Sequence, residues 1–454
     1  MITRLQNQLE NVMPALFGTG LVIYAFTALA FYSYALNPAN LVNGYAGTYL
    51  ILLGLIRIKP SKNKVVLGLI VAVALFTIIG NAIFHYTDSS SVWGELISWT
   101  WSGLIALSIS EFYYSRFKSF LTIWQLVLMA LLLLSAIMNV TEINMSISSL
   151  FTGVLHNSRI SRVGIGFSNV NFLGSFAGTL MMISVFQIIK NNLRIFSITT
   201  FLFGLLLLLN AGSRTPLIAF VVATIVGGII IVLKRWGKML WLGVTAGLVI
   251  ATLWFVLIIY FDTPSSAFFK AYDLASSKRL SLGYEVAQYL KKHHLEVLGT
   301  GLRNKALIKE LFFPGWTWSI QLDSSIGYYL FTLGNIGLTF IIGIWVWILI
   351  RIEKYGSKIA VLTGLYVSVF MFFEHVLFTY AGFFGAFWTT LIFILLRMVA
   401  NRDEHAISIE EPVIIEESLN LSRNQRQKPT FKLVDYLKKK IKNYLSAGNY
   451  VGRK

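Results

Sequence analysis

The amino-acid sequence predicts an all-α polytopic membrane protein, and three observations support this fold class. Of the 454 residues, 56% are apolar and only 13% are charged, whereas a soluble protein has about 25% charged residues. The mean hydropathy is +0.69. Apolar segments of about 20 residues, the length that spans a bilayer, recur along the chain. This composition excludes a water-soluble enzyme, a disordered chain and a nucleic-acid-binding domain.

Twelve segments are long and apolar enough to be membrane spans. No cleavable signal peptide is expected, because residues 1–11 lead directly into the first span without a cleavage pattern. The spans are expected at about 12–36, 39–56, 65–84, 93–111, 119–140, 168–189, 195–213, 215–233, 239–261, 324–350, 358–376 and 381–398.

Basic residues gather at alternate junctions between these spans, as the positive-inside rule predicts for the cytoplasmic side. All of them fall on that side if the N-terminus is cytoplasmic and all twelve spans are real. We therefore expect a multi-pass protein of a bacterial cell membrane with both termini in the cytoplasm. The junctions carry Arg57, Lys59, Lys62 and Lys64; Arg116 and Lys118; Lys190 and Arg194; Lys234, Arg235 and Lys238; Arg351, Lys354 and Lys358; and Arg397 and Arg402.

Two connections on the outer side are long, at about 141–167 and 262–322. Connections of this length are usually functional or disordered. The second contains a helix-like stretch, Leu282–His294, and several aromatic residues, so we expect it to be ordered. The predicted organisation is an integral membrane domain at 1–401, with a catalytic outer loop at 262–322, and a cytoplasmic tail at 402–454.

The tail is acidic at first and becomes basic from Arg423 to Lys454. Between Lys432 and Leu445 its apolar residues recur at near-helical spacing, which is typical of an amphipathic helix on an anionic inner leaflet. The alternative is docking to a chain-length regulator or to a cytoplasmic synthesis enzyme. Most of the net charge of +18 falls on the cytoplasmic side, so it indicates orientation and membrane lipids and requires no nucleic acid.

Arg214 is the most informative of the basic residues expected on the outer side. It lies between two apolar spans, where an ionisable group is costly and usually functional. Ser213 and Thr215 can cap the helix that starts there, with Pro216 in its first turn. A helix N-terminus beside a guanidinium group is a suitable anion site. The alternative is an interfacial arginine that reaches toward lipid phosphates.

Four other features of the outer side have both a structural and a chemical interpretation. Arg279 lies on the first turns of an expected amphipathic loop helix and is either solvated or anion-binding. Gly299 and Gly301 would allow a tight turn with positive φ, although a lone G-x-G is no dinucleotide fingerprint. Asp323 opens a span as an N-cap or as a catalytic carboxylate. Glu374 lies at the outer end of a span and needs a cationic partner.

Taken together, these motifs resemble the O-antigen ligase/polysaccharide polymerase superfamily, and in particular its Wzy-type polymerase branch. The resemblance covers roughly residues 150–350 and rests on the order of four motifs. A histidine replaces Asp323 in the ligase branch, so this aspartate favours the polymerases. The matching residues are Arg162, Gly164, Phe167, Asn169, Asn171 and Gly174; Ser213, Arg214 and Thr215; Arg279, Gly299 and Gly301; and Asp323, Gly334 and Gly337.

The resemblance implies a GT-C-like glycosyltransferase that polymerises oligosaccharide repeat units linked to undecaprenyl pyrophosphate at the outer face of the membrane. Both donor and acceptor would be such lipid-linked glycans. No metal, nucleotide sugar or other cofactor is expected, and the histidines lack metal-ligand spacing. The implied catalytic residues are Arg214, Arg279, Asp323 and Glu374, and the implied substrate-binding residues are Arg162, Asn171, Ser213, Thr215, Gly299, Gly301 and Arg303.

Two other functions remain open at the level of sequence. A ligase of the same superfamily would transfer a finished glycan to lipid A, cell wall or protein through a similar outer site. A transporter or lipid flippase would also have about twelve spans. Against a transporter, the spans hold few ionisable groups, and matching halves with interrupted helices are not evident.

Overall fold

The structure is a computed structural model, and its described part is all α-helical. It describes residues 12–13, 15–24, 40–55, 67–68, 71, 75, 89–144, 146, 163–167, 170–233, 237–261, 266–267, 269–270, 279–301, 325–354, 357–373 and 383–410. The helices are α2 (Asn40–Leu55), α4 (Ser89–Tyr113), α5 (Phe117–Met138), α7 (Val170–Ile189), α8 (Arg194–Ala211), α9 (Arg214–Val232), α10 (Gly237–Phe261), α12 (Arg279–Lys292), α14 (Ser325–Lys354), α15 (Lys358–Phe373) and α16 (Phe383–Glu410), with short 3₁₀ turns η2 (Tyr114–Arg116) and η3 (Val140–Glu142).

Six described helical stretches are long and apolar enough to cross a membrane. One of them, Thr100–Met138, holds two helices, because η2 separates α4 from α5 at the basic junction that the sequence predicted. Large apolar side chains stay exposed on the outside of the spans, such as Ile225 on α9 and Ile250 on α10, at 58% and 63%. Such surfaces suit contact with lipid.

Except for the end of α16, the helices of the membrane domain begin and end within a few residues of the expected spans wherever the structure describes them. The expected spans 12–36 and 65–84 lie largely outside the described residues, so the number twelve stays a prediction. The helix expected within Leu282–His294 is confirmed as α12.

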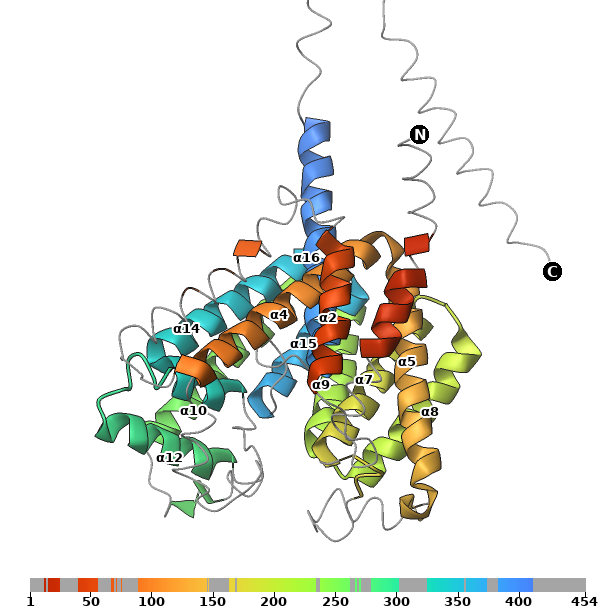
Figure 1. Cartoon of the computed structure of the whole chain (residues 1–454). Coiled ribbons are helices and arrows are strands. Elements are labelled where there is room, and N and C mark those ends of the chain that lie inside the picture. Colours follow the sequence, from red (N-terminus) through yellow and green to blue (C-terminus); the bar gives the residue numbers. More distant parts are fainter. Residues whose placement is uncertain are drawn as a thin grey trace, which may run out of the picture. The chain divides into compact units, whose positions relative to one another are not determined.

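Helix α7 is the most deeply buried of the candidate spans. It packs along α8 and also against α5 and α9 (Figure 1). Its N-terminal half is rich in small residues, including Gly174, Ala177 and Gly178. Small side chains let helix backbones approach closely in a membrane, where packing drives helix association. The small residues of α7 therefore allow its neighbours to approach its N-terminal half closely.

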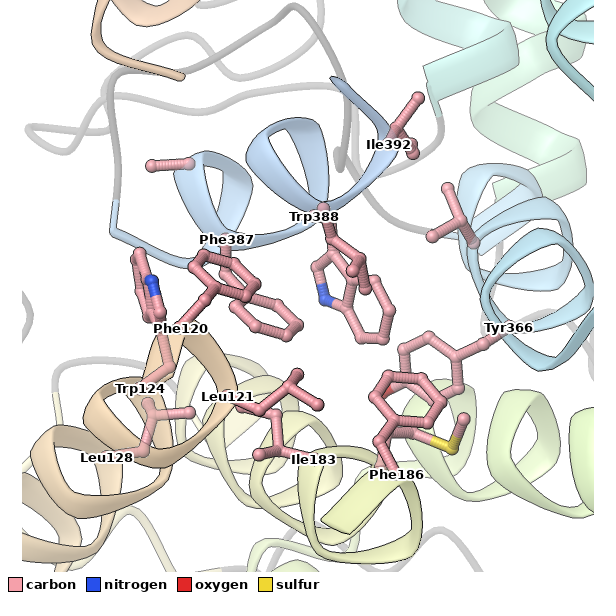
Figure 2. Packing of buried hydrophobic residues seen from close by; sticks show 14 of the residues in the cluster. Phe120, Leu121, Trp124, Leu128, Ile183, Phe186, Tyr366, Phe387, Trp388 and Ile392 are labelled. Atoms are coloured by element: carbon pink, nitrogen blue, oxygen red, sulfur yellow. The ribbon is translucent and has the colours of Figure 1, made fainter. Parts of the chain in front are cut away.

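Aromatic side chains from three helices fill the core beside α7 (Figure 2). The rings of Phe120 on α5 and Phe387 on α16 stack with centroids 5.6 Å apart. Trp388 stacks on Tyr366 of α15 at 4.7 Å. The indole N–H of Trp388 donates to Thr179 Oγ1 on α7 at 3.2 Å, which satisfies the buried indole. This core fixes α16 and α15 against α5 and α7.

A second hydrophobic cluster joins α10, α12 and the N-terminal half of α14. These three helices lie beside one another in Figure 1. Leu280, Val286 and Leu290 form the buried face of α12. They pack with Ile259 of α10 and Phe331 of α14 in the same cluster. The described part of the loop between the expected ninth and tenth spans thus contributes a packed helix.

The chain divides into two units, Met1–Asn401 and Arg402–Lys454. Helix α16 extends to Glu410, beyond the end expected for the last span, because Arg402–Glu410 contains no glycine or proline. Pro412 follows, and a proline disfavours helical geometry in the residue before it. The basic amphipathic segment predicted at Lys432–Leu445 lies outside the described residues.

Candidate functional site

The segment Val163–Phe167, from the first predicted motif, is fixed on the end of α5. Ser135 donates its hydroxyl to the carbonyl of Ile165. Gly166 has φ +78° and packs directly on the amide nitrogen of Asn139. An L-residue is strained at this φ, and a side chain would also collide with Asn139. The turn therefore requires glycine at this position.

Asn210, near the end of α8, joins this segment to the start of α9. It is fully buried, and its carbonyl accepts a hydrogen bond from Val163 N–H at 3.0 Å. Its side-chain oxygen accepts from Asn144 N–H at 2.7 Å, and its amide nitrogen donates to the Asn144 carbonyl at 3.1 Å. Asn210 thus bonds to Asn144 and Val163, which lie near the two ends of the connection 141–167.

The start of α9 lies directly against α7. A Cβ added to Gly174 would overlap the Ser213 side chain, and one added to Gly178 would lie 2.8 Å from Pro216 Cβ. Gly174 and Gly178 are one helical turn apart, so they form one surface of α7. The second predicted motif, Ser213–Thr215, therefore packs on the N-terminal half of α7, the helix that contains the end of the first motif.

The prediction that Ser213 caps α9 is wrong. Ser213 does occupy the N-cap position with extended backbone, at φ −84° and ψ 110°, but its side chain makes no capping hydrogen bond. Its side chain is instead packed against Gly174 and is only 2% exposed. Pro216 lies in the first turn as predicted. The helix N-terminus beside Arg214 thus has no capping oxygen from Ser213.

With Ser213, four predicted site residues thus lie around this junction. Arg214 is the first residue of α9 and is partly exposed, and Thr215 beside it is buried. Asn171 lies in the first turn of α7 and is partly exposed. A cation and a helix N-terminus at one helix junction can attract a phosphate or pyrophosphate oxygen.

Gly299 and Gly301 form a separate part of the predicted site, against α14. Both have positive φ, at +74° and +75°, as the sequence predicted. They pair with a break in α14 at Gly334, whose backbone is non-helical at φ 64° and ψ −167°. The segment from Glu296 to Gly301 supplies the hydrogen bonds that the broken helix lacks.

At this break, hydrogen bonds to the loop replace two hydrogen bonds of a continuous helix. An uninterrupted helix would join Asn335 N–H to the Phe331 carbonyl and Ile336 N–H to the Thr332 carbonyl. Here each of those four groups bonds to the loop instead. The N–H groups of Asn335 and Ile336 donate to the carbonyls of Glu296 and Val297, at 2.8 Å and 3.1 Å. The carbonyls of Phe331 and Thr332 accept from the N–H groups of Thr300 and Gly301, at 2.7 Å and 2.9 Å.

The remaining predicted site residues are placed only in part. Arg279 is the first residue of α12, and its side chain is outside the described part of the chain. Arg162, Arg303, Asp323 and Glu374 lie outside the described residues. The structure therefore brings the described part of the first motif to the second motif, Ser213–Thr215. It also brings Gly299 and Gly301 to Gly334. Helix α10 contacts both α9, which carries the second motif, and α12.

The sequence interpretation missed the residues that fasten these motifs together. Asn210, Ser135 and Asn139 are polar residues near the ends of otherwise apolar spans. Such residues need partners inside the protein, because lipid provides none. That signal was available for Asn210, but the identity of its partners depends on contacts that no local pattern reveals.

Comparison with known proteins adds no family to these observations, because no family model and no curated protein sequence matches the chain. Among the described residues, no group of three or more His, Asp or Glu is placed to hold a metal ion. The functional interpretation therefore depends on the geometry of the junction and on the motifs themselves.

Proposed function

We propose that this protein is an integral-membrane glycosyltransferase with about twelve spans and a GT-C-like fold, which polymerises lipid-pyrophosphate-linked oligosaccharide repeat units at the outer face of a bacterial cell membrane. The observation that carries the proposal is the hydrogen bond from Val163 N–H to the Asn210 carbonyl, at 3.0 Å. It ties the motif containing Arg162 to the motif containing Arg214. The segment that directly follows Arg162 in the sequence is thereby bonded to the helix end that precedes Arg214.

The chemistry that suits this junction is departure of a pyrophosphate. An acceptor hydroxyl oxygen attacks the anomeric carbon, and the bond from that carbon to the pyrophosphate oxygen breaks. The electron pair leaves on the phosphate, where Arg214 and Arg279 would stabilise the developing charge. Planar guanidinium groups pair with phosphate oxygens through two hydrogen bonds. Asp323 would accept the proton of the hydroxyl, with Glu374 as the second candidate.

Substrate binding is proposed for the residues around these groups. Asn171, Ser213 and Thr215 belong to the α7–α9 junction. Gly299 and Gly301 shape the backbone beside α14, and Arg162 and Arg303 complete the proposed set. Membrane lipids and a chain-length regulator are the other proposed partners. We also propose that both termini lie in the cytoplasm.

The test is glycan extension by the detergent-solubilised full-length protein supplied with a lipid-linked repeat unit. We expect longer lipid-linked glycans from the wild type and none from Arg214→Ala or Arg279→Ala. Lys291→Ala is the matched control for Arg279, because Lys291 is an exposed cation on the same helix. A transporter would give no extended product, and wild-type products from both arginine variants would exclude the proposed role of the arginines.

A further inference from the structure

A cavity of about 440 Å³ lies at the helix ends that the positive-inside rule predicts to be cytoplasmic. It is formed where η2 meets the start of α5 and is also lined from the end of α7, the residue before α15, and α16. Three of its lining residues are cations, Arg116, Lys118 and Lys190, and none of its ten described lining residues is acidic. Like charges repel when they gather without an anion. The concentration of charge therefore suggests an anionic ligand.

Arg116 supplies the most specific evidence. Its Nη1 atom is buried and has no hydrogen-bond partner in the described part of the chain. Its guanidinium carbon lies 5.1 Å from the centre of the Phe112 ring, so the side chain is supported on one face by an aromatic ring. Arg116 lines the cavity and is partly exposed, so its positive charge lies beside the space that an anionic ligand would occupy.

Two further donors face the same space. Helix α5 begins at Phe117 with no side-chain cap on its first turn, so its N-terminus adds backbone N–H groups and a positive dipole. Lys190 directly follows α7, and its ammonium nitrogen lies 5.7 Å from the centre of the Phe117 ring. A guanidinium, an ammonium and a helix N-terminus together are the donor set that proteins use for phosphate groups.

The remaining walls distinguish a lipid from a free phosphate ion. Phe117, Leu395 and Met398 give the cavity an apolar side. Basic pockets between the cytoplasmic ends of membrane helices commonly hold phosphate headgroups of lipids. We infer that this cavity binds the phosphate headgroup of an anionic inner-leaflet lipid, through Arg116, Lys190 and the N-terminus of α5. The inference does not depend on the proposed glycosyltransferase activity.

The experiment measures lipid binding to the full-length protein in detergent by native mass spectrometry, with phosphatidylglycerol and phosphatidylcholine as probes. We expect the wild type to retain phosphatidylglycerol in preference to phosphatidylcholine. Arg116→Gln and Lys190→Gln should each weaken phosphatidylglycerol binding about fivefold, the effect of one charge near a lipid surface. Lys238→Gln is the matched control, because Lys238 is an exposed cation on the same predicted face outside the cavity.

Two results would overturn the inference. The first is wild-type phosphatidylglycerol binding by both cavity variants, or equal retention of the two lipids by the wild type. The second is displacement of phosphatidylglycerol by inorganic phosphate together with a persistent phosphate adduct, which would assign the cavity to a soluble anion. If Arg116→Gln fails to fold, Lys190→Gln still provides the test, because Lys190 is partly exposed at the end of a helix.

Discussion

Gly299 and Gly334 lie back to back, each occupying the space that a side chain on the other would need. A Cβ added to Gly299 would be 2.5 Å from the backbone nitrogen of Gly334, and a Cβ added to Gly334 would be 2.5 Å from the backbone nitrogen of Gly299. Both residues have positive φ. This reciprocal contact is what lets the loop segment replace the missing helical hydrogen bonds of α14.

Replacing either glycine with alanine should therefore disrupt the break in α14. Each substitution places a Cβ against backbone atoms that cannot move aside and adds strain at positive φ. We expect a loss of about 2–4 kcal/mol in stability from strain and overpacking together. The measurement is thermal unfolding of the detergent-purified protein, with Gly299→Ala and Gly334→Ala each compared with the wild type.

Gly343→Ala is the control for these variants, because Gly343 lies in α14 with open space around it. It should match or slightly exceed wild-type stability, since alanine favours a helix more than glycine does. If Gly334→Ala were as stable as Gly343→Ala, then the break in α14 would not exist in the folded protein.

The sequence could predict where the helices lie but not this break. Span length and the placement of basic residues are local properties, so α7, α9 and α10 were found within a few residues of their bounds. The break at Gly334 depends on pairing with residues 296–301, which lie 33–38 positions earlier in the chain. A G-x-x-G pattern inside an apolar span is equally compatible with a continuous helix that packs closely against a neighbour.

The contact between Gly174 and Ser213 leads to a prediction about the proposed site. Gly174→Ala would push the Ser213 side chain, and with it the start of α9, away from α7. Because Arg214 follows Ser213 directly, we expect extension of the lipid-linked glycan to fall at least about tenfold, as misplacement of a catalytic group by about 1 Å can cost more than that. The assay is glycan extension by purified protein.

Gly228→Ala is the matched control on α9, because an added Cβ there has open space. It should extend glycan at the wild-type rate. Thermal unfolding of both variants separates a local shift at the junction from general destabilisation. Full activity of Gly174→Ala would show that the close seating of Ser213 on α7 does not matter for catalysis.

The candidate site shows the same contrast between local sequence patterns, which were predictable, and tertiary contacts, which were not. The motif order placed Arg214 at the start of a helix, and Gly299 and Gly301 at positive φ, because these are local consequences of sequence. The orientation of the Ser213 side chain toward Gly174 was not predictable, since a serine before a helix is usually a cap. Tertiary packing against a glycine on another helix overrides that preference.

A buried polar cluster between α5, α7 and α8 should contribute to stability through Thr200. Gln125 donates its amide to Thr200 Oγ1 at 2.6 Å, and Ser184 lies 2.9 Å from the same hydroxyl. Thr200→Val keeps the shape but removes that hydroxyl, so we expect a loss of about 1 kcal/mol, typical of hydrogen bonds between membrane helices. Thermal unfolding of the purified variant measures it.

Thr199 is the neighbouring control on the same helix. Its hydroxyl bonds only within α8, to the Ile195 carbonyl at 3.1 Å. Thr199→Val should therefore unfold at nearly the wild-type temperature. Equal losses from the two valine variants would mean that the cluster does not join the three helices.

Glu111 and Arg397 form a buried ion pair between α4 and α16. The Arg397 Nη2 and Glu111 Oε1 atoms are 3.5 Å apart, and the side chains are only 6% and 7% exposed. Arg397 also lies over the Tyr114 ring, at 5.3 Å from its centre. The positive-inside rule used Arg397 only to orient the chain in the membrane. The buried carboxylate of Glu111, near the end of α4, also gives it a structural partner.

Breaking this pair from one side should cost far more than removing it entirely. Glu111→Leu leaves a buried guanidinium without its counter-ion, and Arg397→Met leaves a buried carboxylate, so each should lose about 3–5 kcal/mol. The double variant Glu111→Leu/Arg397→Met removes both charges and replaces them with apolar groups of similar volume. We expect it to be within about 1 kcal/mol of the wild type, because the desolvation of two charges largely offsets their attraction. Thermal unfolding of all four proteins in the same detergent gives the coupling energy, and simple additivity of the two single losses would show that Glu111 and Arg397 do not interact.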